Sequence, residues 1–291
     1  MIKYTLTVLF SAAMIFSVNA QNKAYQIFTS KGLEIEYEDM VGKLMESNIV
    51  FFGELHNDPI SHWLEYRVLK DASKMIDAKP VVGAEMFESD DQLILNEYLN
   101  GLIKEKHFKK EAKIWNNYET GYRPLVEFAR KNDLKFIATN IPRRYASLVS
   151  REGFEGLDTL TAEAKKYIAP LPIQYNPELP GYKKMLNMGN MHGMEKHVNE
   201  NLPKAQAVKD ATMAHFILEH FNKESVFLHY NGTYHSNNKE GIVWYIKQKQ
   251  PELVIKTIAT VRQEAIEELE KENLEIADFI IVVPSDMTTT Y

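Results

Sequence analysis

The stretch from 48 to 59, N-I-V-F-F-G-E-L-H-N-D-P, decides the predicted fold. After Asn48 it has four apolar residues in a row, which is typical of a strand buried on both faces. The dipeptide N-D at 57–58 then supplies helix-capping side chains, and Pro59 suits the first turn of a helix. Two polar residues, Glu54 and His56, stand between the two elements. The stretch therefore predicts a strand that leads through a polar turn into a helix.

The same alternation continues along the rest of the chain. Short apolar runs predict further strands at 80–84, 134–139, 226–230, 253–260 and 279–283. Helical patterns lie between them, at 59–77, 89–101, 124–132, 142–152, 205–221 and 241–248, with an acidic helix at 262–272. Strands that alternate with helices predict an α/β fold with a mostly parallel sheet flanked by helices.

A Pro- and Met-rich stretch at 169–194 interrupts this rhythm. A loop of that length is usually functional or a linker. With its flanking helices it predicts an inserted, smaller helical cap at about 90–215. No clean linker separates it from the rest, so we expect a single domain over 21–291.

The composition excludes several classes of protein. Of 291 residues, 45% are hydrophobic and 25% are charged, which is ordinary for a globular chain. The net charge of −6 lacks the basic footprint of a nucleic-acid-binding protein. The absence of cysteine excludes disulfides, thiolate metal sites and a cysteine nucleophile.

The first twenty residues have the three parts of a secretory signal peptide. Lys3 precedes an apolar run, and small residues around Ala20 suit a cleavage site. The apolar run is short for a membrane anchor and contains Thr and Ser. We therefore expect an exported, soluble protein without a membrane span after cleavage, in the periplasm or secreted.

Polar side chains gather at the ends of the predicted strands. Parallel strands place their carboxyl ends at one edge of the sheet, where ligands of open α/β folds bind. Taken singly, each of these side chains has an ordinary explanation, such as a charge at a helix start or a packed loop histidine. Together they predict one cleft, formed by Glu54, His56, Glu85, Glu88, Asn140, Arg143 and His235.

Two kinds of chemistry suit these residues. Carboxylates and imidazoles hold a divalent metal ion, for which Glu54, His56, Glu85 and His235 are the candidates. The same groups also perform general acid–base catalysis, with an arginine to neutralise negative charge. The sequence has no G-x-S-x-G, no phosphate-binding loop and no H-E-x-x-H, which disfavours a serine hydrolase, a nucleotide enzyme and an ordinary zinc peptidase.

Six motifs in order resemble those of the ChaN-like haem-binding uptake proteins, in the Tiki and erythromycin-esterase-like superfamily. They are G-E-L-H, G-A-E-M-F-E, Y-R-P-L-V-E-F-A-R, T-N-I-P-R-R, Q-A-V-K-D-A-T-M-A and N-G-T-Y-H. The resemblance spans roughly 47–260, which is most of the chain, and the order of the motifs is more specific than any one of them.

The resemblance implies an α/β core with a helical lid, export, and haem binding in iron uptake, with a homodimer as a setting for the haem. In the wider superfamily these motifs carry hydrolytic or metal-dependent chemistry. Carried onto this chain, they mark Glu54, His56, Glu85 and His235 as the ancestral cleft, with Glu88, Asn140, Arg143 and Asp210 as neighbours. Relatives are often lipoproteins, whereas this chain has no cysteine to carry a lipid.

The haem contacts are not fixed by any motif. Haem takes an axial ligand from His, Tyr or Met and needs an apolar wall. An arginine, Arg143 or Arg144, suits a propionate. The methionines of the 175–197 stretch alternatively fill gaps under a lid. The candidates for haem binding are Tyr175, Met191, His192, Met194, Tyr234 and Arg144.

Three functions follow as hypotheses. The first is an exported haem-binding protein for iron or haem acquisition. The second is a metal-dependent hydrolase, an esterase or peptidase, that uses the Glu/His cleft. The third is a degenerate, non-catalytic fold used in protein interaction, and the sequence leaves open whether the chain is an enzyme.

Overall fold

The quoted stretch forms the middle of the sheet in the computed structural model, which describes residues 23–188 and 199–291. Strand β2 (Ile49–Glu54) pairs in parallel with β5 (Phe227–Gly232) on one side and with β6 (Ile255–Gln263) on the other. All six residues of β2 are buried, because helices cover both faces of the sheet. The predicted buried strand is therefore confirmed.

The described residues form one seven-stranded sheet in the order β1-β7-β6-β2-β5-β3-β4. Every pair of neighbours is parallel except β1 and β7, which are antiparallel. The remaining strands are β1 (Gln26–Thr29), β3 (Val81–Glu88), β4 (Phe136–Asn140) and β7 (Phe279–Pro284). The predicted α/β class with a mostly parallel sheet is confirmed.

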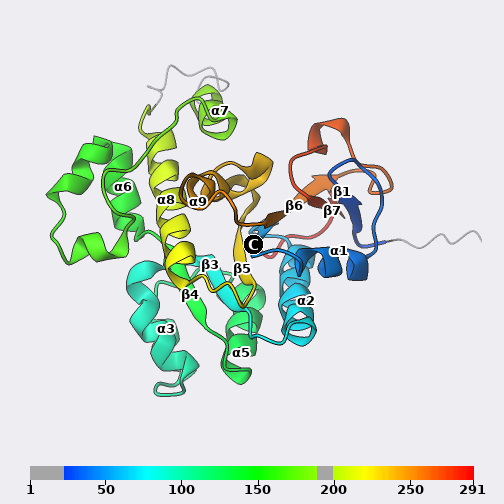
Figure 1. Cartoon of the computed structure of the whole chain (residues 1–291), viewed down its shortest axis with the longest axis horizontal. Helices are drawn as coiled ribbons and strands as arrows, with labels where there is room; N and C mark the ends of the chain where they lie inside the picture. Colours follow the sequence, from blue (N-terminus) through cyan, green and yellow to red (C-terminus); the bar gives the residue numbers. More distant parts are fainter. Residues whose placement is uncertain (1–22, 189–198) are drawn as a thin grey trace, which may run out of the picture.

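Helices cover the two faces of this sheet (Figure 1). One face packs against α1 (Tyr37–Leu44), α2 (Pro59–Met75), α3 (Gln92–Leu99), α4 (Glu105–Glu111) and α5 (Arg123–Lys131). The other face packs against α8 (Leu202–His220) and α9 (Ile242–Lys249). Helix α6 (Arg143–Glu152) packs on the first half of α8, and α7 (Pro180–Met188) also contacts that half through Tyr182 and Asp210. The sheet is thus the middle layer of three.

The start of α2 is fixed as the sequence predicts. Asp58 caps the helix: its side chain accepts hydrogen bonds from the backbone N–H groups of Ile60 (3.0 Å) and Ser61 (2.9 Å). Its second oxygen pairs with Arg262 of β6 at 2.9 Å. The turn between β2 and α2, which carries His56, is therefore anchored to the neighbouring strand.

Two parts of the chain differ from the prediction. The acidic helix predicted at 262–272 is wrong, because β6 continues to Gln263 in register with β7 and an irregular loop follows. The Gln263 side chain holds that loop by hydrogen bonds to the Ala265 and Glu268 carbonyls. Strand β1 and helix α1 were not predicted from the sequence.

In its described residues, the stretch proposed as a helical insertion, about 90–215, contributes β4 to the sheet and is otherwise helical or irregular. Its description as a cap within a single domain stays a prediction. The proposed signal peptide, 1–20, lies outside the described residues. Within the two described ranges, none of the helices has the length and apolar character needed to cross a membrane.

Candidate functional site

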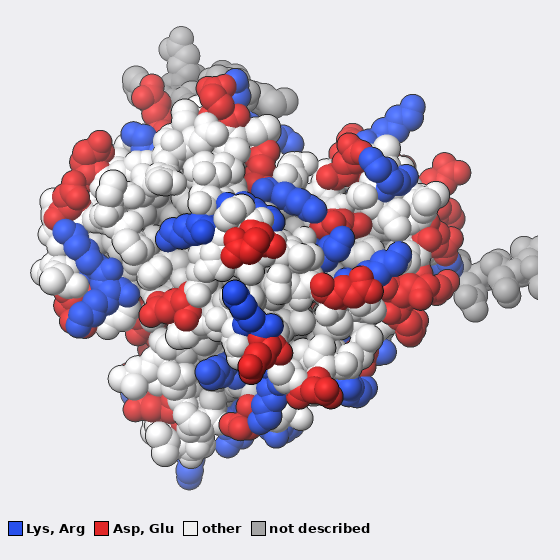
Figure 2. All heavy atoms as spheres, in the orientation of Figure 1, with Lys and Arg blue, Asp and Glu red and all other residues white. Residues whose placement is uncertain are grey.

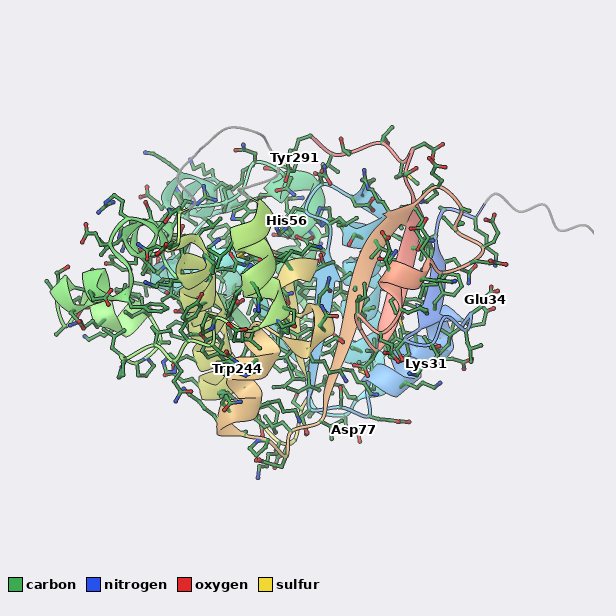
Figure 3. All side chains as sticks on the ribbon, turned by 90° about the horizontal axis from the view of Figure 1, so that it is seen from above. Lys31, Glu34, His56, Asp77, Trp244 and Tyr291 are labelled. Carbon is green, nitrogen blue, oxygen red and sulfur yellow. The ribbon has the colours of Figure 1, made fainter. Side chains whose placement is uncertain are left out.

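The strand ends named by the sequence lie side by side. Strands β2, β5, β3 and β4 are consecutive in the sheet, and their last residues are Glu54, Gly232, Glu88 and Asn140. Figure 3 shows His56 and Tyr291 at this end of the molecule and Asp77 at the opposite end. The backbone N–H of Thr290 donates to the Asn57 carbonyl at 2.9 Å, so the C-terminal segment reaches the same loop.

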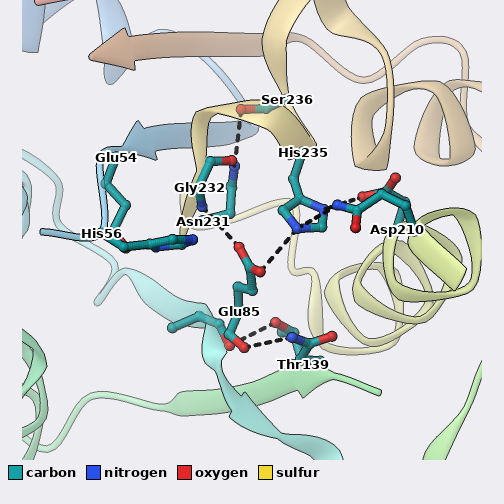
Figure 4. Close-up of polar contacts among 12 residues, drawn as sticks. Glu54, His56, Glu85, Thr139, Asp210, Asn231, Gly232, His235 and Ser236 are labelled. Carbon is teal, nitrogen blue, oxygen red and sulfur yellow. Dashed lines mark hydrogen bonds and ion pairs between the residues drawn. The ribbon is translucent and has the colours of Figure 1, made fainter. Parts of the chain in front are cut away.

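A chain of ion pairs forms on the side of the sheet that faces α8 (Figure 4). His235 Nε2 lies 3.0 Å from Glu85 Oε1, and His235 Nδ1 lies 2.5 Å from Asp210 Oδ1. The Tyr182 hydroxyl donates to Asp210 Oδ2 at 2.7 Å, and the Gln206 amide lies 2.9 Å from His235 Nε2. We call Glu85, Asp210, His235, Gln206 and Tyr182 the α8-side cluster.

A shift in strand register gives Glu85 its place. Strand β3 pairs with β5 only as far as Ala84, opposite Tyr230, and its pairing with β4 changes register between Ala84 and Glu88. Beyond that point Glu85 Oε2 accepts the backbone N–H of Gly232 at 2.9 Å. The side chain of Glu85 thus takes over a hydrogen bond at the end of β5.

The α8-side cluster is almost fully buried, and its charges depend on one another. Glu85, His235 and Asp210 are 4%, 4% and 1% exposed. Burial opposes the charge of His235, but Glu85 and Asp210 outweigh it and raise its pKa to about 9. Burial likewise opposes the charge of Glu85, but His235 lowers the pKa of that carboxyl well below its usual range. Burial raises the pKa of Asp210. His235 is therefore an imidazolium at neutral pH.

A second cluster lies on the side of the sheet that faces α2. His62 Nδ1 lies 2.9 Å from Glu54 Oε2 and 3.2 Å from Glu65 Oε2. His56 Nδ1 lies 2.6 Å from Glu54 Oε1, and the Tyr122 hydroxyl donates to the same oxygen at 2.7 Å. We call Glu54, His56, His62, Glu65 and Tyr122 the α2-side cluster.

The two carboxyls of this cluster ionise differently. Burial works against the charge of Glu54, but hydrogen bonds from His56 and His62 outweigh it and lower the pKa of Glu54. Burial and the neighbouring Glu54 raise the pKa of Glu65 well above its usual value. Burial also opposes the charge of His62, yet its bonds to Glu54 and Glu65 raise its pKa to about 11. The cluster holds one carboxylate and one imidazolium at neutral pH, with the second carboxyl neutral.

Strand geometry explains why there are two clusters. Successive side chains of a strand point to opposite faces of a sheet. Val50 and Phe52 of β2 pack on the α2 side, so Glu54 follows them to that side. Val81 of β3 packs on the α8 side, and the side chain of Glu85 in the same strand also lies on that side, against His235. The sequence predicted one cleft, whereas these two carboxylates lie on opposite faces.

His56 joins the two clusters at the edge of the sheet. A Cβ atom on Gly232 would lie 2.8 Å from His56 Nε2 and 3.7 Å from Glu85 Oε2, so the imidazole approaches the backbone where glycine leaves room. In Figure 4 the ring of His56 extends from the Glu54 side towards Gly232. The side chain of His56 is 36% exposed, whereas that of Glu54 is 0% exposed. The imidazole is thus the part of this junction that solvent reaches.

Of the three other predicted residues, only Asn140 contacts a cluster among the described hydrogen bonds and ion pairs. The Asn140 side-chain amide donates to the Glu85 carbonyl at 2.9 Å, which supports the end of β3. Glu88 lies 3.6 Å from Lys113 and contacts neither His56 nor His235 through a described hydrogen bond or ion pair. Arg143 is exposed at the start of α6.

The residues predicted to contact haem are only partly described. Met191, His192 and Met194 lie outside the described residues. Tyr234 is 39% exposed, and its hydroxyl donates to the Gly181 carbonyl at 2.7 Å. Tyr175 is half-buried, with its ring centre 5.6 Å from that of Phe154 and 5.7 Å from that of Tyr182. Arg144 pairs with Asp90 at 2.7 Å. On the face drawn in Figure 2, basic and acidic side chains are interspersed.

Sequence reasoning missed the part of the α2-side cluster that comes from outside the strand ends. His62 and Glu65 stand three residues apart, a spacing that places them on one face of a helix. The face of a helix that packs on a sheet is ordinarily apolar, so a His-x-x-Glu pair on that face was the available signal. Tyr122 and Gln206 had no comparable signal, because their neighbours come from distant parts of the chain.

Comparisons with known proteins agree with this architecture. A solved structure described as cofacial heme binding to ChaN of Campylobacter jejuni matches with a TM-score of 0.66 and 19% identity, over 90% of this chain and 98% of that one. A succinoglycan biosynthesis protein matches with a TM-score of 0.51 and 10% identity, over 85% of this chain and 89% of that one. At these identities the likeness shows the fold.

A curated relative is found in Arabidopsis thaliana. It is Protein RETICULATA-RELATED 5, chloroplastic, which is 26% identical over 187 residues, 61% of this chain. The match covers 25% of that relative's length.

The family model described as haem-binding uptake, Tiki superfamily, ChaN matches residues 40–246. That range runs from α1 to α9 and includes every member of the two clusters. It confirms the resemblance drawn from the motifs. The chain therefore belongs to the ChaN haem-binding uptake family of the Tiki superfamily.

Proposed function

We propose that this protein binds haem at the carboxyl edge of its sheet, in the service of haem or iron acquisition. The observation that carries the proposal is the family match over 40–246, which includes the whole edge. Haem would supply a flat apolar ring, two propionates and an iron that takes an axial ligand. The first twenty residues support the accompanying proposals of export and of a location in the periplasm or outside the cell.

The exposure of the two clusters supports haem over a ligand that must enter a deep cleft. Glu54, Glu85 and His235 are 1%, 4% and 4% exposed, so the carboxylates are enclosed. Tyr234 and the His56 ring both reach solvent at this edge. A flat ligand covers such a surface without entry into the clusters.

Tyr234 is the axial ligand we propose. The Tyr234 hydroxyl is exposed and donates a hydrogen bond to the Gly181 carbonyl. In the haem complex, the iron would replace that carbonyl as the partner of the Tyr234 oxygen. Tyr175, with Phe154 beside it, would contribute to the apolar wall. The guanidinium of Arg144, which already pairs with Asp90, would also donate hydrogen bonds to a haem propionate. Met191, His192 and Met194 stay predictions as further contacts, as does a homodimer around the haem.

An absorbance titration with hemin tests the proposal. We expect a saturable Soret shift in the wild type and a loss of affinity of about tenfold or more in Tyr234→Phe, which removes only the hydroxyl. Tyr66→Phe is the matched control, because Tyr66 packs between α2 and α5 against Phe128. A wild-type spectrum equal to that of free hemin with an inert protein would contradict haem binding. An unchanged Tyr234→Phe would contradict the ligand.

Hydrolysis is the second candidate, and the α8-side cluster favours it. A histidine held between two carboxylates is a recurrent acid–base arrangement. Because the pKa of His235 is raised to about 9, it would act as a proton donor at neutral pH. A metal ion held by Glu54, His56, Glu85 and His235, as predicted from the sequence, would serve this purpose. A screen of esters and peptides tests the hydrolase, and turnover that survives in Glu85→Gln and His56→Ala would exclude it.

A further inference from the structure

Three ligand-type side chains converge inside the α2-side cluster. Glu54 at the end of β2 and His62 and Glu65 on α2 each offer one atom, and these atoms lie within 4.8 Å of one another. The three residues are 1%, 4% and 0% exposed. His62 Nδ1 faces Glu54 Oε2 at 2.9 Å and Glu65 Oε2 at 3.2 Å. The donor atoms thus surround one point in the protein interior.

One oxygen atom in this group lacks the partner that burial requires. Glu65 Oε1 is buried without a hydrogen-bond partner among the described residues, and Glu54 Oε2 is satisfied only by its ion pair with His62. A buried carboxylate oxygen is costly unless a donor or a cation satisfies it. If both carboxyls were ionised, they would carry more negative charge than one imidazolium balances. A bound cation would satisfy both the charge and the oxygens.

The surrounding hydrogen bonds orient the donors. His62 Nε2 donates to the His56 carbonyl at 3.0 Å, which leaves Nδ1 to face the carboxyls. The Tyr122 hydroxyl donates to Glu54 Oε1 at 2.7 Å, so the other oxygen of Glu54 faces His62. Metal-bound histidines commonly donate their second ring N–H to a backbone carbonyl, and metal-bound carboxylates are hydrogen-bonded in turn. The second layer of a metal site is therefore already present.

We propose that Glu54, His62 and Glu65 form a buried site for one divalent transition-metal ion. One nitrogen and two carboxylates suit ions such as Mn²⁺, Fe²⁺, Co²⁺ or Zn²⁺. The ion takes the place of the proton between His62 and the carboxyls, so its binding releases protons to solvent. The site shares only Glu54 with the metal set predicted from the sequence, because Glu85 and His235 lie on the other face. It does not depend on haem binding.

The test is equilibrium binding of Co²⁺ to the purified, metal-stripped protein, measured by visible absorption and by metal analysis after gel filtration. We expect about one Co²⁺ per chain and a loss of affinity of about 100-fold or more in Glu65→Gln. Tyr122→Phe, which removes only the second-layer hydroxyl, should lose about tenfold. His215→Ala is the surface control, because His215 and Glu219 form an accessible pair on α8.

Each outcome bears on the proposal. It holds if Glu65→Gln loses the ion while His215→Ala and Glu85→Gln keep it. No tight Co²⁺ on the wild type, or wild-type affinity in Glu65→Gln, overturns it. If His215→Ala loses Co²⁺ binding, the ion lies on the surface. If Glu85→Gln loses Co²⁺ binding, the ion lies on the α8 side of the sheet. Either result overturns the proposal. If Glu65→Gln fails to fold by circular dichroism, an unchanged affinity in Tyr122→Phe overturns it. Hemin binding in the same variants is read separately.

Discussion

Replacement of Glu85 by glutamine tests the electrostatics of the α8-side cluster. The carboxylate of Glu85 is the largest of the influences that raise the pKa of His235 from 6.5 to about 9. That rise corresponds to about 3 kcal/mol, at about 1.4 kcal/mol for each tenfold change in proton affinity. Asp210 remains beside His235 in the variant and keeps part of this stabilisation. We therefore assign about 2 kcal/mol of the free energy of unfolding to Glu85 near pH 6.5.

The sign of the pH dependence follows from the raised pKa. The stabilisation is complete below the unfolded-state pKa of about 6.5, where His235 is protonated in both states. It is lost as the pH rises through about 9, where the folded-state His235 gives up its proton. The stability gap between wild type and Glu85→Gln should accordingly be largest near pH 6.5 and shrink towards pH 10.

Urea unfolding of both proteins across this pH range measures the gap. Glu219→Gln is the control, because Glu219 is an exposed partner of His215 on α8 and its loss should change stability by less than about 1 kcal/mol. A gap between wild type and Glu85→Gln that stays constant from pH 6 to pH 10 would refute the assignment of the imidazolium to His235.

Three further predictions concern residues in and beside the sheet. Gly232→Ala should destabilise the fold by about 1–3 kcal/mol in urea unfolding, because its Cβ would lie 2.8 Å from His56 Nε2. The control is Gly42→Ala in α1, where a Cβ would meet nothing within 4 Å. This variant should instead stabilise the fold by about 0.5–1 kcal/mol. Asp58→Ala should lower the free energy of unfolding by about 3 kcal/mol in the same assay, because it removes the cap of α2 and leaves Arg262 without its buried partner. A decrease of less than about 1 kcal/mol would contradict that reasoning. Burial lowers the pKa of His229 to about 4, so ¹⁵N chemical shifts should show it neutral at pH 5.5, and a titration near pH 6.5 would contradict its burial.

Local signals explain why the central unit was predictable. The apolar run before Gly53 and the N-D-P capping sequence act within a few residues, so the β2–α2 unit follows from sequence alone. The acidic loop after Gln263 was not predictable in this way, because its helical pattern yields to pairing between β6 and β7. Tertiary pairing overrides local propensity there.

The arrangement of the candidate site was only half predictable. Parallel strands brought Glu54, His56, Glu85 and His235 to one edge, as expected from strand direction. Which face each side chain takes depends on strand parity and on which helices cover each face, and neither is encoded near the residue itself. The register shift after Ala84, which lets Glu85 bind Gly232, likewise arises only in the assembled sheet.

The position of a bound haem iron tests the central proposal most directly. Diffraction measured at the iron absorption edge, from crystals of the wild-type protein grown with hemin, locates that iron without assumptions about spectra. We expect an iron peak within bonding distance of the Tyr234 hydroxyl oxygen, outside the carboxyl edge of β5. Iron bound to another part of the protein, or no iron in saturated crystals, would contradict it.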